Sequence, residues 1–129
     1  MTAKPPKNGG ALQRLGPLLI IFVMMPTLAL GHSFPNHSDP RVGSEVKTPP
    51  TQVKIWFDAG IEPLFSSISV FDANKKQVDK GDSHIEGNDN TVFEVSVPLL
   101  PPGTYEVFWS VISVDTHHTE GRFKFKIEG

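Results

Sequence analysis

The stretch TYEVFWSVISV, residues 104–114, alternates its side chains with a period of two. The aromatic and β-branched residues at positions 105, 107, 109 and 111 share one face. The stretch RFKFKIE, residues 122–128, repeats the pattern with three apolar residues facing one way and three basic residues the other. Such alternation is the signal of half-buried strands. The polar segment DTHHTEG between them predicts a β-hairpin.

The same period continues toward the amino terminus. Between the expected strands lie segments rich in Pro, Gly, Asn and Asp, which are typical of turns, and GDSHIEG (81–87) is interpreted as a loop. No segment after residue 31 has helical periodicity over ten residues. Several short strands at turn spacing predict an all-β fold, an antiparallel sandwich or small barrel. The further expected strands are residues 51–57, 66–72 and 91–97.

The first 31 residues differ from the rest of the chain. Residues 1–14 carry three basic side chains and no acid, and residues 15–30 carry no charge. Ala29 and Gly31 are the small residues expected before a cleavage site. We therefore interpret residues 1–31 as a secretory signal peptide.

The alternative interpretation of the apolar run is an uncleaved membrane anchor. The run is short for a span of about 20 residues, and Pro17 and Pro26 interrupt it. Cleavage would leave residues 32–129 as one β-domain outside the cytoplasmic membrane, which we expect to be periplasmic.

Composition excludes several classes of function. The chain has no cysteine, so disulfides, thiolate metal sites and thiol catalysis are excluded. It carries 12 basic and 14 acidic residues without a basic run, and the basic residues of 122–128 face away from the aromatic residues between them. Nucleic acid is therefore not an expected partner.

The best candidate for chemistry is the segment SVDTHHTEG (113–121). Asp115 and His117 are two residues apart, so in an extended chain they point to the same side with Cα atoms about 6.5–7 Å apart. A single metal ion fits between such side chains, while His118 points to the other side. The alternative is a polar hairpin loop without function.

Cleavage after Gly31 would make His32 the new amino terminus. A terminal histidine binds a metal through its α-amine and Nδ1, which close a six-membered chelate ring. With His117 and Asp115 the donor set is three nitrogens and one oxygen. Tetragonal Cu(II) suits this set, although Zn(II) accepts the same donors. Thr119 and Glu120 are candidates for hydrogen-bonding support of the ligands.

The remaining histidines are weaker candidates. His37 is five residues from the expected terminus, and His84 lies in the loop expected at 81–87. Both are interpreted as solvated side chains. The acidic residues around His84 are interpreted as solvated surface: Asp82, Glu86 and Asp89.

Three blocks of sequence together resemble the CopC-type periplasmic proteins of copper resistance and homeostasis. The similarity spans nearly all of the chain after residue 31, and the last block carries the family's long signature L-x-x-G-T-Y-x-V-x-W-x-V-x-S-x-D-x-H-x-x-x-G. The blocks are SDPRVGSEV (38–46), VKIWFDAGIEPLFSSISVFDANKKQV (53–78) and LPPGTYEVFWSVISVDTHHTEGRFKFKI (100–127).

The resemblance implies a fold, a ligand and a role. The fold is a Greek-key β-barrel or sandwich of cupredoxin-like or immunoglobulin-like type. The ligands of one Cu(II) per chain fall on His32, Asp115 and His117. The implied role is a carrier or buffer of copper rather than an enzyme, and the implied partner is a CopD-type copper transporter of the inner membrane.

The chain also departs from the family pattern. All three methionines precede residue 32, so no thioether site for Cu(I) is available. Ala59 stands where some members carry an acid, and His118 stands where relatives often have Lys or Pro. Two other functions are considered: a copper oxygenase with a histidine brace, and a metal-free sandwich for adhesion or chaperoning.

Overall fold

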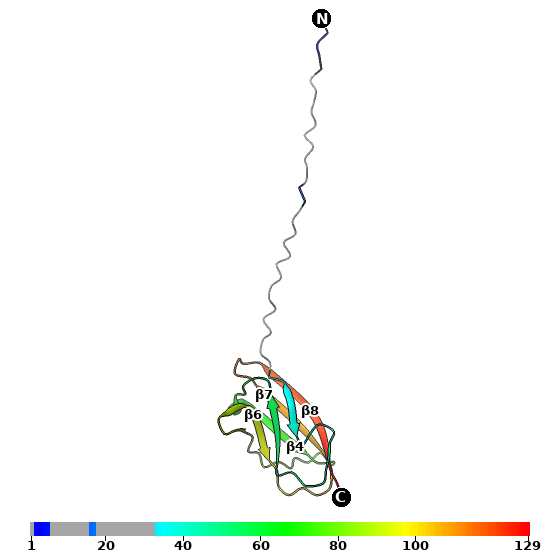
Figure 1. Cartoon of the computed structure of the whole chain (residues 1–129), viewed down its shortest axis with the longest axis vertical. Coiled ribbons are helices and arrows are strands. Elements are labelled where there is room, and N and C mark those ends of the chain that lie inside the picture. The colour runs from blue at the N-terminus through cyan, green and yellow to red at the C-terminus, as the bar shows by residue number, and fades with distance from the viewer. Residues whose placement is uncertain (1, 6–15, 18–32) are drawn as a thin grey trace.

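The computed structural model describes residues 2–5, 16–17 and 33–129, and the last range folds into two facing β-sheets (Figure 1). The first sheet has the strand order β1-β3-β6-β5, and the second has the order β2-β8-β7-β4. The strands of the first sheet are β1 (Pro35–Asp39), β3 (Gln52–Phe57), β5 (His84–Glu86) and β6 (Asp89–Ser96). Those of the second sheet are β2 (Glu45–Val46), β4 (Ser67–Phe71), β7 (Gly103–Ile112) and β8 (His118–Ile127).

The predicted all-β sandwich is confirmed. The chain crosses repeatedly between the sheets, which is the connectivity of Greek-key sandwiches. Within the described residues the helical structure is one 3-10 turn, η1 (Pro63–Phe65). No described helix has the length and hydropathy that crossing a membrane requires.

One strand pair differs from the antiparallel expectation. Strand β2 runs parallel to the end of β8, with Glu45 opposite Lys126 and Val46 opposite Ile127. Hairpins force neighbouring strands to be antiparallel. Strand β2 reaches β8 from the other sheet without a hairpin, so its direction is not constrained in this way.

The core lies between the two sheets and is built from the inward positions of each strand. Burial in β7 and β8 follows the alternation that the sequence predicts. The ring of Trp109 packs edge-on to Phe57, with centroids 5.5 Å apart. Seven side chains of the core have no exposed surface: Val53, Ile55, Val70, Phe93, Val95, Val107 and Val111.

The hairpin of β7 and β8 also packs closely at a glycine. A Cβ atom on Gly121 would lie 2.5 Å from a ring carbon of Trp109. Real Cβ atoms do not approach that closely, so glycine allows the indole to lie against the backbone of β8. The close approach packs β7 and β8 tightly against each other near the β7–β8 turn.

One strand is longer than predicted, and three further strands are present. Strand β8 begins at His118 rather than at residue 122, so the connection from β7 is only five residues, 113–117. Strands β1, β2 and β5 were not predicted, and the loop expected at 81–87 contains β5. These three strands are short and mostly polar, so their pairing partners rather than their own sequences place them.

Candidate metal centre

The turn between β7 and β8 carries two of the predicted ligands. The amide of Ser113 donates to the carbonyl of His117 at 2.9 Å, and the amide of Thr116 donates to the carbonyl of Ser113 at 2.8 Å. Thr116 has a φ of 73°, which is a costly conformation for a β-branched residue. The segment is therefore a tight turn, and the extended geometry expected for it is wrong.

Asp115 and His117 nevertheless lie side by side. Oδ1 of Asp115 is 3.3 Å from Nδ1 of His117, and about a third of each side chain is exposed. The turn thus places a carboxylate and an imidazole side by side, with part of each side chain at the surface. This pairing agrees with the prediction, although a turn rather than a strand produces it.

Ser113 holds Asp115 in place. Its hydroxyl donates to Oδ1 of Asp115, and the amide of His117 also approaches that oxygen at 3.4 Å. The hydrogen bond from Ser113 lowers the pKa of Asp115 below its ordinary value, slight burial opposes the shift, and contacts with His117 add to it. Asp115 is therefore an ionised carboxylate at neutral pH.

The first described residues of the domain are attached to the same end of the sandwich. Ser33 is fully buried, and its carbonyl accepts a hydrogen bond of 2.6 Å from Oγ1 of Thr119. Its hydroxyl donates to the carbonyl of Gly60 at 3.3 Å. Figure 1 shows the start of β1, in cyan, and the orange β7–β8 turn at the same end, away from the carboxyl terminus.

Phe34 strengthens this attachment. Its amide donates to Oδ1 of Asp58 at 2.7 Å, and its carbonyl accepts from the amide of Asp58 at 2.9 Å. Residues 33 and 34 are thus joined both to the chain after β3 and to the start of β8. We call these hydrogen bonds of Ser33 and Phe34 the amino-terminal clamp. They join residues far apart in the chain, and the sequence did not predict them.

The predicted ligand His32 lies outside the described residues. Among the residues that the structure does describe, no three His, Asp or Glu side chains gather into a group able to hold a metal ion. Asp115 and His117 are the two members of the predicted ligand set that the structure describes.

His118 has its own contacts on β8. Its Nε2 lies 2.8 Å from the hydroxyl of Ser110 and 3.8 Å from Oε2 of Glu120. Ser110 belongs to the outward face of β7, so His118 lies away from the pair of Asp115 and His117, as the spacing predicts. Glu120 therefore contacts His118, whereas Thr119 is the residue that faces inward.

The two weaker histidines are both exposed, as their interpretation as solvated side chains expects, and each also contacts a neighbouring residue. His37 stacks on Trp56 with ring centroids 4.2 Å apart. His84 lies in β5, where its Nδ1 is 2.6 Å from the carbonyl of Asp82 and its Nε2 is 2.9 Å from Oε1 of Glu94. The contact with the Asp82 carbonyl raises the pKa of His84, burial opposes the shift, and Glu94 adds to it.

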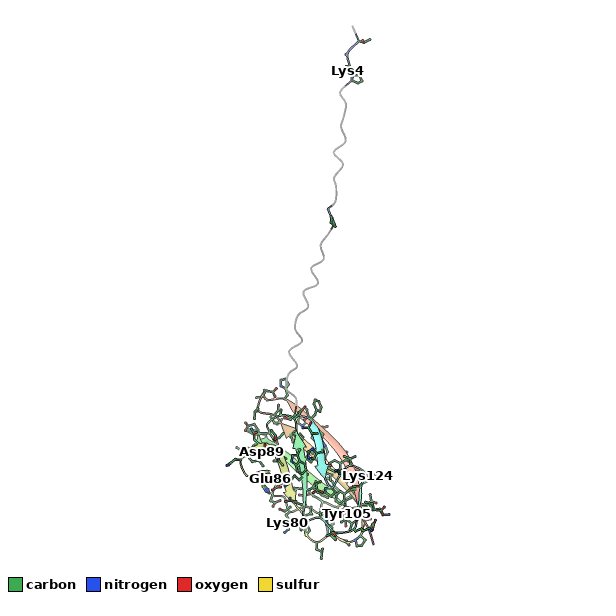
Figure 2. All side chains as sticks on the ribbon, in the orientation of Figure 1. Lys4, Lys80, Glu86, Asp89, Tyr105 and Lys124 are labelled. Carbon is green, nitrogen blue, oxygen red and sulfur yellow. The ribbon has the colours of Figure 1, made fainter. Side chains whose placement is uncertain are left out.

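Acidic residues near His84 also form ion pairs. Lys54 bridges Glu86 at 3.1 Å and Glu94 at 3.5 Å. Figure 2 shows Glu86 on the side of the sandwich opposite Lys124 of β8. These side chains therefore form an ion-pair group on the outer face of the first sheet, in which Glu86 is exposed, as expected for solvated surface.

Comparison with known proteins shows the family. The family model of the CopC domain matches residues 36–128, so the chain belongs to the CopC domain family. The chain is 31% identical over 111 residues to the copper transport protein CutJ of Bacillus subtilis. That match covers 85% of this chain but only 20% of CutJ.

Solved structures share the fold. CopC from Methylosinus trichosporium OB3b has a TM-score of 0.71 and 33% identity, with 75% of this chain and 94% of that chain covered. PcoC, a methionine-rich copper resistance protein from Escherichia coli, has a TM-score of 0.64 and 23% identity, with 75% and 99% covered. The second likeness concerns the fold alone.

Proposed function

We propose that the protein binds one Cu(II) through the α-amine and imidazole of His32, the imidazole of His117 and the carboxylate of Asp115. The observation that carries the proposal is the burial of Ser33 beside the β7–β8 turn. His32 directly precedes Ser33, and consecutive Cα atoms are 3.8 Å apart. A ligand from His32 would therefore lie one residue from a backbone that is hydrogen-bonded to the start of β8.

The short separation along the chain between Thr119, which binds Ser33, and His117 of the turn supports the same proposal. The carbonyl of Ser33 contacts Thr119, which is two residues after His117 in the chain. Two residues of chain span at most about 7 Å. The α-amine and ring of His32 can thus meet the side chains of Asp115 and His117 around one ion.

The donor set favours Cu(II) over softer ions. Three nitrogens and one carboxylate oxygen suit Cu(II), which also leads the divalent metals in affinity. The chain after residue 31 has neither Cys nor Met, so it offers Cu(I) no soft ligand. Copper also appears in the name of CutJ, which this chain resembles over 85% of its length.

We further propose where and how the copper is carried. Residues 1–31 would direct export, and residues 32–129 would act in the periplasm as a copper carrier or buffer. Asp115 would occupy a coordination position that a copper oxygenase leaves open, so binding without catalysis is favoured. CutJ is named a copper transport protein and is much longer than this chain. The proposed partner is an inner-membrane copper transporter of the CopD type, as the resemblance to the CopC-type proteins implies.

Mass spectrometry of the exported protein tests the function. We expect the mass of a chain that begins at His32. When Cu(II) is added under non-denaturing conditions, this mass should increase by that of one copper ion. Cu(I) should be retained much more weakly, because no thioether or thiol is available. Failure to retain Cu(II), or tight binding of a second copper, would contradict the proposal.

A further inference from the structure

Buried polar side chains are unevenly distributed in the described part of the chain. Burying a hydroxyl is unfavourable unless it is hydrogen-bonded, so each such residue requires an explanation. Three of the five buried polar residues lie at the end that carries Asp115 and His117. The five are Ser33, Ser38, Glu94, Ser113 and Thr119.

Thr119 occupies a position where the strand pattern favours an apolar residue. The inward positions of β8 continue from it as Gly121, Phe123, Phe125 and Ile127. Its side chain is buried, yet its hydroxyl is used by the carbonyl of Ser33, 86 positions earlier in the sequence. No local role within the hairpin requires this hydroxyl, because the two strands pair through their backbones.

Ser113 plays the corresponding part inside the turn. It has no exposed surface, and its hydroxyl donates to Asp115 while lying 3.3 Å from the amide of His117 and 3.2 Å from the carbonyl of His117. One hydroxyl therefore contacts both residues that project from the turn. Its loss would leave Asp115 with only the longer contacts to His117, at 3.3 and 3.4 Å.

We propose that Thr119 and Ser113 are positioning residues of the copper site, one for the amino-terminal ligand and one for the ligands of the turn. The inference rests on the proposed function. Thr119 holds the backbone of Ser33, the residue that directly follows His32 in the chain, at the start of β8. Ser113 directs the carboxylate of Asp115 toward the same point. Ligands held in place before the ion arrives lose less freedom on binding, which raises affinity.

The test compares Thr119→Val with a matched control, Ser38→Ala. Ser38 is also buried, and its hydroxyl donates to the carbonyl of Pro40 at 2.8 Å. Each substitution removes one buried hydroxyl from one carbonyl, so both should lower Tm. Only Thr119→Val should weaken Cu(II) binding, by roughly tenfold, as loss of a ligand-orienting hydrogen bond typically does. Thr119→Ser keeps the hydroxyl and should restore most of the affinity.

A second measurement needs no metal. In the metal-free exported protein, Thr119→Val should increase the backbone motion of Ser33 and Phe34 in ¹⁵N relaxation, whereas Ser38→Ala should leave it unchanged. In the Cu(II) form, Ser113→Ala should alter the EPR parameters, because Asp115 is no longer directed to the ion.

The outcomes separate the inference from the function on which it rests. If the unmodified protein binds one Cu(II) and Thr119→Val binds it equally well, the positioning role is wrong and the proposed function stands. The same holds if Ser38→Ala costs as much affinity as Thr119→Val. If the unmodified protein takes up no Cu(II), both are wrong.

Discussion

A single extra residue before His32 should lower the affinity for Cu(II) by on the order of a hundredfold, or about 2.7 kcal/mol. The extension keeps every side chain but turns the α-amine of His32 into an amide, whose nitrogen lone pair is delocalised. The ion then loses one nitrogen and the six-membered chelate ring. Export and cleavage would thus complete the site only after the protein has left the cytoplasm.

Competition with a chelator of known affinity measures this effect at several pH values. The α-amine has an unperturbed pKa near 7.7–8.0, so the ion must displace its proton below that range. Affinity should therefore fall as the solution becomes acidic. In the extended protein Cu(II) displaces about one proton fewer, so its affinity should depend less steeply on pH. A residue added after Gly129 is the matched control, because the carboxyl terminus lies at the opposite end of the sandwich (Figure 1). Equal affinities for the extended and unextended forms would mean that the amine is not a ligand.

Substitutions in the β7–β8 turn should produce the other large loss. We expect His117→Ala to reduce Cu(II) affinity about a hundredfold, since a nitrogen donor is removed. Asp115→Asn should cost less, about tenfold, because the amide oxygen remains while the charge is lost. Isothermal titration with a competing chelator measures both.

Two other histidines provide the controls for the turn. His37→Ala and His84→Ala should leave the affinity for Cu(II) nearly unchanged. His84→Ala should still lower the free energy of unfolding, because Glu94 is buried and loses one of its two basic partners. If His84→Ala weakens copper binding as much as His117→Ala, the proposed copper site is wrong.

The main strands were predictable because burial drives the alternation of their side chains. The predicted strand at 51–57 corresponds to β3, and that at 104–114 corresponds to β7. Strand β6 shows where the pattern fails. Its residues from Val92 to Val95 are all buried, because ion pairs of Lys54 and His84 cover Glu94 on the outer face. Such cover comes from other strands and leaves no local signal.

The candidate site was predictable only in part. The spacing of Asp115 and His117 indicated that they share a side, but the turn that joins them depends on Thr116 at positive φ, which no propensity favours. The clamp of Thr119 on Ser33 joins residues 86 positions apart. A threonine at an inward position of an otherwise apolar strand was the available signal for it.

The position of copper in crystals of the exported, Cu(II)-loaded protein tests the central claim most directly. Anomalous scattering at the copper absorption edge locates the ion independently of its surroundings. The account predicts one copper per chain at the β7–β8 turn, bonded to the α-amine and ring of His32, the ring of His117 and a carboxylate oxygen of Asp115. Copper bound to His84 and Glu94, or copper at the turn without the α-amine of His32, would contradict it.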